Sequence, residues 1–289
     1  MKSFTYTTSA NLNEACRILA ENKGARILAG GTDLLVKMKR GSVTAEMIVD
    51  IKKIPEICGI HTESSGMIFI GALTTLSELA GSAVIREKMP VLAATATKMA
   101  SMQVRNRATI GGNLCNAAPS ADLAPPLIAL DAQATIVGSK GERKIPLSVM
   151  FQGPGSTTLA HDEILTGLLI PLPHSDKRFT YLKHGTRRAM DIAVVGVAVG
   201  LLCKDHVCRE ADIVLGAVAP VPLRVRAASL YLMEGGLTEK TIEHVANIAA
   251  AEATPISDVR ASAGYRQDII KILVKRAIYE TAGITGRKG

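Results

Sequence analysis

Two loops with a glycine doublet hold the residues of this chain whose types and spacing could do chemistry. Residues 29–34 read AGGTDL, and residues 109–113 read TIGGN. Glycine permits positive φ and a close approach of ligand to backbone, so successive N–H groups can bind phosphate oxygens. No lysine is then required to hold the anion. Two such loops predict one ligand that carries two phosphates.

The surroundings of both loops favour a ligand over a plain turn. The first loop follows a strand-like run at residues 26–29 and precedes a helical run at 34–39, which places N–H groups at the start of a helix. The second continues into residues 114–127, whose small residues leave room for a flat ligand. Neither loop has the spacing of a Rossmann fingerprint or of a P-loop, so an NAD-type or ATP-type site is disfavoured. One such loop alone would more often be a tight turn.

The two loops, together with residues 181–193 (YLKHGTRRAMDIA), resemble the FAD-binding medium subunit of molybdenum hydroxylases, as in bacterial xanthine dehydrogenase and aerobic carbon monoxide dehydrogenase. The resemblance covers essentially the whole chain, and an aspartate nine residues past Asn113 adds to its specificity. The FAD-binding positions that it implies are Ile27, Leu28, Ala29, Gly30, Gly31, Thr32, Asp33, Leu34, Thr109, Ile110, Gly111, Gly112, Asn113, Asp122, Leu165 and Lys183.

Some of these residues also have an ordinary structural explanation. Asp33 can accept N–H bonds as a turn or cap residue. Asp122 either contacts the flavin nucleotide, as the resemblance implies, or caps the helix that begins at Leu123. The resemblance also places Leu165 and Lys183 beside the isoalloxazine ring, the first as an apolar wall and the second as a cation that raises the potential of the flavin. Without the resemblance, Lys183 would be a surface lysine on a strand.

The second loop offers side chains as well as backbone. Thr109 and Asn113 can donate hydrogen bonds, while Gly111 and Gly112 allow the backbone to come close to a ligand. None of the six histidines lies in either loop, so FAD is expected to bind without a covalent link. No Ser-His-Asp triad or paired carboxylates are evident. We therefore expect no catalytic side chain, and the redox chemistry would belong to the cofactor.

Cysteine usage predicts neither a disulfide framework nor a metal site. The five cysteines are scattered, and an odd number cannot all pair, so we expect reduced thiols. Cys203 and Cys208 flank a predicted hairpin turn at residues 204–206, where a metal would need two more ligands than the neighbourhood offers.

Composition excludes several other classes of protein. The chain has 289 residues and a net charge of +8, but its basic residues are dispersed, and five Tyr, four Phe and no Trp give little for stacking nucleic-acid bases. The sequence has no secretory signal and no uninterrupted apolar run long enough for a membrane span. A cytoplasmic protein that binds no nucleic acid is expected.

The apolar pattern predicts an α+β fold: two α/β subdomains, followed by a C-terminal domain with a small antiparallel sheet and helices. The resemblance implies that the two subdomains form a two-lobed FAD-binding domain with FAD between them. The domains are expected at residues 1–173, with subdomains at about 1–56 and 57–173, and at 177–286. Two prolines within 171–176 indicate the linker. The expected helices are 11–21, 91–100, 224–234, 238–253 and 261–282, and the strand-like runs are 26–29, 47–51, 67–71, 134–137, 163–170, 179–183, 193–202 and 210–218.

The resemblance implies an electron-transfer subunit of a heteromeric enzyme. A large partner subunit would oxidise substrate at molybdopterin, and a small one would pass electrons through two [2Fe-2S] clusters to the FAD, which delivers them to NAD or another acceptor. The chain itself lacks iron–sulfur cysteines and would need both partners. The alternative is a self-contained flavin oxidase or reductase with the same FAD fold, but the C-terminal half shows no evident general base for it. A non-catalytic nucleotide-binding scaffold, which would be colourless, is a third possibility.

Overall fold

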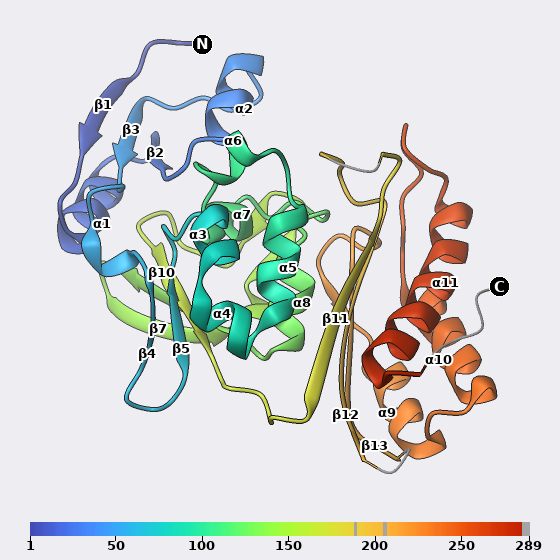
Figure 1. The fold of residues 1–289 in the computed structure, drawn as a ribbon. Helices are drawn as coiled ribbons and strands as arrows, with labels where there is room; N and C mark the ends of the chain where they lie inside the picture. Colours follow the sequence, from blue (N-terminus) through green and yellow to red (C-terminus); the bar gives the residue numbers. More distant parts are fainter. Residues whose placement is uncertain (188–189, 205–206, 285–289) are drawn as a thin grey trace.

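The computed structural model describes residues 1–187, 190–204 and 207–284. It confirms the α+β class: two sheets with their helices form the N-terminal part, and a third sheet carries the C-terminal helices (Figure 1). Within these ranges, no helix has the length and apolar character that a membrane crossing requires. The same residues contain no group of three or more His, Cys, Asp or Glu side chains that could hold a metal ion.

The first subdomain is a parallel sheet with the strand order β1-β3-β2, built from β1 (Thr5–Thr8), β3 (Met47–Asp50) and β2 (Ala25–Leu28). Helix α1 (Leu12–Glu21) begins where the side chain of Asn11 accepts the N–H of Glu14, and it packs its apolar face against the sheet. Helix α2 (Leu34–Arg40) ends at Gly41, whose φ of 76° suits glycine. The first glycine loop therefore joins β2 to α2, as predicted.

The second subdomain has an antiparallel sheet in the order β4-β5-β10-β6-β7, with a cluster of short helices and a small hairpin beside it. The strands are β4 (Ile60–Thr62), β5 (Ile68–Gly71), β6 (Gln133–Gly138), β7 (Gly141–Pro146) and β10 (Ile164–Ile170), with the hairpin β8 (Phe151–Gly153) and β9 (Ser156–Thr157). The helices are η1 (Pro55–Ile57), α3 (Leu76–Gly81), α4 (Ala83–Lys88), α5 (Pro90–Lys98), α6 (Met102–Arg105), α7 (Ile110–Cys115), α8 (Ala124–Ala129) and η2 (Leu147–Val149).

The second glycine loop is the first turn of a helix, which the sequence did not predict. The Thr109 side chain accepts the N–H of Gly112 at 3.0 Å and so caps α7 at its start. Glycine is a poor helix former, so the pattern of residues 109–113 favoured a loop. The cap, the hydrogen bonds to the carbonyls of residues 72 and 74, and the contacts with β10 outweigh that preference here.

The C-terminal domain is an antiparallel sheet with three helices on one face. The strands β11 (Lys177–His184), β12 (Val195–Lys204), β13 (Val207–Gly216) and β14 (Leu223–Arg224) lie in that order, and the helices are α9 (Arg226–Gly235), α10 (Glu239–Glu252) and α11 (Ala263–Ala282). The predicted hairpin is confirmed because β12 pairs with β13, although residues 205 and 206 of its turn lie outside the described ranges.

Both faces of this sheet are covered. Helices α9, α10 and α11 pack on one face (Figure 1). On the other face, Ala198 of β12 and Val214 of β13 join the hydrophobic core of the second subdomain. Helix α8 supplies that contact, since all six of its residues are buried and it touches β11, β12, β13 and β14.

A buried arginine fixes the start of α11 against the sheet. Arg266 is only 3% exposed, and its guanidinium donates to the carbonyl oxygens of Val194 and Ala217 and to the carboxylate of Asp258. The backbone N–H of Arg260, the guanidinium of Arg266 and the backbone N–H of Ala261 lower the pKa of Asp258 to about 2.

Asp258 should therefore stabilise the fold in a way that depends on pH. Its folded pKa lies below the unfolded value of about 3.9, so its contribution is complete above pH 4 and is lost as the pH falls from about 4 to 2. We expect Asp258→Asn to lower the urea midpoint at pH 6, and the difference from wild type to shrink below pH 4. Asp176→Asn, at an exposed carboxylate, is the control. A difference that stays constant from pH 6 to pH 2.5 would contradict the assignment.

Candidate functional site

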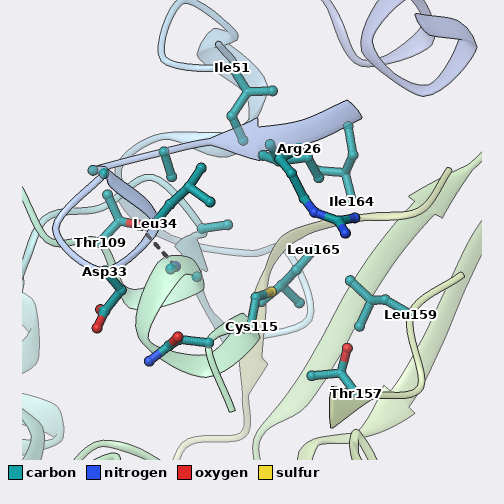
Figure 2. Close-up of a pocket in the computed structure, with 18 of the residues that line it drawn as sticks. Arg26, Asp33, Leu34, Ile51, Thr109, Cys115, Thr157, Leu159, Ile164 and Leu165 are labelled. Atoms are coloured by element: carbon teal, nitrogen blue, oxygen red, sulfur yellow. Dashed lines mark hydrogen bonds between the residues drawn. The ribbon is translucent and has the colours of Figure 1, made fainter. Parts of the chain in front are cut away.

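A pocket of about 740 Å³ lies between the two subdomains and is large enough for a cofactor. Its walls come from the first glycine loop, α2 and residues 42–44 of the first subdomain, and from α7, residues 155–161 and the start of β10 of the second. Figure 2 shows Thr109, Asp33 and Leu34 on one side of it and Leu159, Ile164 and Leu165 on another. Both glycine loops thus meet at one cavity.

The first loop presents a row of unused backbone donors to the pocket. Five consecutive residues, 30 to 34, line it, and none of their N–H groups donates to any acceptor within the described ranges. The carbonyls are used instead: Gly31 accepts from Leu35 at 3.1 Å, and Asp33 accepts from Lys37 at 2.9 Å. Unused N–H groups that face a cavity are suited to an anion such as a phosphate.

In the second loop, the N–H groups of residues 110–113 all donate within the described part of the chain, and only that of Thr109 does not. The N–H groups of Ile110 and Gly111 donate to carbonyls of residues 74 and 72, and those of Gly112 and Asn113 donate to the side chain and carbonyl of Thr109. What remains for a ligand is the N–H and hydroxyl of Thr109 and the Asn113 amide. The Oδ1 atom of Asn113 is buried and has no donor in the described part of the chain, which a ligand hydroxyl or N–H would supply.

The glycines serve packing as much as ligand access. A Cβ on Gly30 would overlap the carbonyl oxygen of Arg107, so its absence lets the two subdomains touch. A Cβ on Gly111 would stand 2.6 Å from the Cβ of Ala72, at the end of β5. Gly31 has a φ of 76°, which other residues rarely adopt. The doublets therefore set the distance between the loops.

Most of the residues predicted for the site line this pocket: Ile27, Ala29, Gly30, Gly31, Thr32, Asp33, Leu34, Thr109, Gly111, Gly112, Asn113 and Leu165. Two others point into the protein core, Leu28 with 8% of its surface exposed and Ile110 with none. The last two, Asp122 and Lys183, are not among the residues that line it.

Asp122 and Lys183 form an ion pair between the two domains. The Nζ of Lys183, on β11, donates to the Asp122 carboxylate at 2.7 Å, and the Tyr181 hydroxyl donates to its other oxygen at 2.8 Å. Lys183 also donates to the carbonyl of Asp191 at 2.6 Å. Burial and the Asp122 charge raise the pKa of Tyr181 well above its usual value, so it stays a donor.

The ordinary explanations considered for three residues are wrong. Asp122 does not cap α8, whose cap is Leu123, because its carboxylate is directed at β11. Lys183 is not a surface lysine, since only 17% of its side chain is exposed. Asp33 makes no cap bond: its ψ of −48° is helical, whereas capping side chains reach the N–H groups from an extended conformation.

The pocket also contains residues that sequence reasoning missed. Arg26 points into it from β2 (Figure 2). Lys37 of α2 donates to the Asn116 amide oxygen at 2.5 Å and bridges the two subdomains. His161 lies 2.9 Å from the carbonyl of Asn22 and bridges them a second time. The helical spacing from Asp33 to Lys37 was a usable signal. No local signal indicates His161, because its partner is 139 residues away in the chain.

A cysteine lies in the wall of the same pocket. The Cys115 thiol opens onto the cavity, and the surrounding walls desolvate it and raise its pKa to about 12. A neutral thiol, not a thiolate, therefore faces the pocket near neutral pH.

Two family models cover nearly the whole chain. The model described as the FAD binding domain in molybdopterin dehydrogenase matches residues 2–173, and the model described as the CO dehydrogenase flavoprotein C-terminal domain matches residues 180–281.

Similar proteins agree with these matches over their full length. The xanthine dehydrogenase FAD-binding subunit of Escherichia coli O157:H7 is 34% identical over 98% of both chains, and the carbon monoxide dehydrogenase medium chain of Hydrogenophaga pseudoflava is 32% identical over 95% of this chain and 96% of that one. A solved carbon monoxide dehydrogenase from the latter organism superposes with a TM-score of 0.95 at 31% identity over 99% of both chains. Quinoline 2-oxidoreductase from Pseudomonas putida 86 gives 0.93 at 29% identity, over 99% of this chain and all of that one.

Proposed function

The chain belongs to the family of FAD-binding medium subunits of molybdenum hydroxylases, and from that premise we propose that it relays electrons from the [2Fe-2S] clusters of a small partner subunit, by way of its FAD, to NAD or another acceptor. The molybdopterin would sit on a large partner subunit. The observation that carries the proposal is the row of unused N–H groups at residues 30–34, all of which line a pocket of cofactor size.

The residues of the pocket fit a flavin dinucleotide. We assign the diphosphate to the N–H groups of the first loop, and we assign the Thr109 hydroxyl and Asn113 amide to ligand donors and acceptors nearby. Leu165 would cover the ring as an apolar wall. When bound, FAD supplies the redox chemistry, because it exchanges electrons both singly and in pairs. The protein's part is to bind and orient it and to exclude water.

Asp122 and Lys183 enter the proposal in a positioning role. Their ion pair joins the loop before α8 to β11, and we infer that it holds the C-terminal domain against the FAD-binding domain. Tyr181 supports the pair from the same strand. This role replaces the direct flavin contact predicted from the sequence, since neither side chain lines the pocket.

The proposal also includes the bounds of the domains and the cellular location of the protein. We propose an FAD-binding domain at residues 1–173, with subdomains at about 1–56 and 57–173, and a C-terminal domain at 177–286, whose residues 285 and 286 lie outside the described ranges. The ranges matched by the two family models support it. Five free cysteines suit a cytoplasmic location.

Anaerobic reduction of the flavin tests the relay. The purified chain should hold FAD, and dithionite should bleach it, yet the substrate of the complex should bleach it at least about a hundredfold more slowly than after the iron–sulfur and molybdenum subunits are added. The reason is that, in this proposal, substrate is oxidised at the molybdopterin of the large subunit. Visible flavin absorbance with and without the partners is the measurement.

Two outcomes would contradict the relay. Bleaching by substrate at full rate with this chain alone would indicate a self-contained oxidase. A chain that remains colourless after incubation with FAD would indicate a non-catalytic scaffold.

A further inference from the structure

Lys37 is a positive charge held inside the cofactor pocket. It lies on α2, one turn after the first glycine loop, and it lines the pocket with its side chain partly buried. Its Nζ donates to the amide oxygen of Asn116, which follows α7, at 2.5 Å. The ammonium group therefore links α2, which follows the first glycine loop, to the residue after α7, which begins with the second.

The charge of Lys37 has no counter-ion among the described residues. Asn116 is neutral, and no ion pair joins Lys37 to Asp33 or to any other carboxylate in these ranges. Two other partly buried lysines have carboxylate partners, Lys177 with Glu210 and Asp212 and Lys183 with Asp122, whereas Lys271 and Lys275 of α11 have none in the described ranges and, unlike Lys37, do not line the pocket. Withdrawing an ammonium group from water without an anion is unfavourable. An anionic ligand in the pocket would remove that cost.

We propose that Lys37 binds the diphosphate of FAD and that Asn116 holds it in position to do so. This inference rests on the FAD pocket described above and not on the electron relay. An ammonium group has three donors, so one can remain on Asn116 while two reach a phosphate. The first loop alone could hold the anion through its N–H groups, and Lys37 adds a charge-assisted contact to them.

The test is the FAD dissociation constant of the full chain after its flavin has been removed, measured by calorimetry for four variants. Lys37→Met should weaken binding roughly tenfold or more, the amount expected for a hydrogen bond to a charged group. Lys37→Arg keeps the charge and should stay within about threefold of wild type. Lys39→Met is the matched control, because Lys39 is an exposed lysine on the same helix that does not line the pocket.

The Asn116→Ala variant separates the effect of the Lys37 charge from the effect of its hydrogen bond to Asn116. It keeps the Lys37 ammonium group, so it should weaken FAD binding by less than about threefold. The phosphorus NMR signals of bound FAD give a second readout: Lys37→Met should shift them, and Lys39→Met should not.

Three results would overturn the proposal. One is an unchanged dissociation constant in Lys37→Met. Another is an equal loss in Lys37→Met and Asn116→Ala without rescue by Lys37→Arg, which would make the residue a structural bridge only. The third is phosphorus signals that do not respond to Lys37→Met. Bleaching by substrate with this chain alone would contradict the relay but leave these measurements intact, because they require no partner subunit. A chain that binds no FAD would overturn both proposals.

Discussion

Gly30→Ala should abolish stoichiometric FAD binding. The added Cβ would overlap the carbonyl oxygen of Arg107 and would lie 3.1 Å from the Cα of Ala108. The contact is with backbone, which cannot rotate away as a side chain can. The first loop must therefore withdraw from the segment before Thr109, and the N–H groups at residues 30–34 lose their alignment with the second loop. We expect an affinity loss of at least about a hundredfold and a stability loss of roughly 1–3 kcal/mol.

The measurement is flavin bound per chain after gel filtration, together with the thermal midpoint. Gly81→Ala is the matched control, because a Cβ there meets nothing within 4 Å and its φ is not positive. The control should keep its flavin and its midpoint. If Gly30→Ala retained a full complement of FAD, the close approach of the two subdomains would not be needed for binding.

The second large effect is expected at the junction of the two domains. Asp122→Ala removes the only carboxylate that faces Lys183 and Tyr181 among the described residues, and it leaves a lysine with 17% of its side chain exposed and without a counter-ion. Breaking a buried ion pair from one side costs about 3–5 kcal/mol. We expect a drop of that size in the free energy of unfolding, measured by urea denaturation of the flavin-bound chain.

The double variant Asp122→Ala/Lys183→Met shows whether the unpaired charge causes that drop. Removing both charges should restore a substantial part of the stability, because replacing a buried pair with apolar groups is often neutral. Tyr181→Phe loses only one hydrogen bond and should cost about 1–3 kcal/mol, the cost of an unpaired buried acceptor. A double variant as unstable as Asp122→Ala would show that packing, and not charge, dominates at this junction.

The sequence was a good guide wherever the decisive information is local. The first glycine loop, with the strand before it and the helix after it, was predicted correctly because each feature depends on neighbouring residues. The three C-terminal helices were also predicted, at 224–234, 238–253 and 261–282, and they lie at Arg226–Gly235, Glu239–Glu252 and Ala263–Ala282. Their apolar faces repeat with helical spacing over many residues.

Contacts between residues far apart in the chain could not be predicted from local sequence patterns. The sequence could place Asp122 and Lys183 near the flavin only by resemblance, and their mutual ion pair, across 61 residues, leaves no local trace. The pocket wall at residues 155–161 and the bridge from His161 to Asn22 are hidden for the same reason. Helix α7 was missed because its two glycines disfavour a helix that tertiary contacts impose.

The sheet of the C-terminal domain, enclosed by α8 on one side and by α9–α11 on the other, has a consequence for synthesis on the ribosome. Helix α8 is made well before strands β12 and β13, which cover it. Until those strands emerge, the apolar surface of α8 that packs on β12 and β13 stays exposed, although its other side contacts α5 and η2. The cofactor-binding half therefore cannot reach its final state ahead of the C-terminal half, and a stalled or cleaved chain would expose a surface prone to aggregation. The two halves depend on each other for folding, although the phosphate-binding loops belong to only one of them.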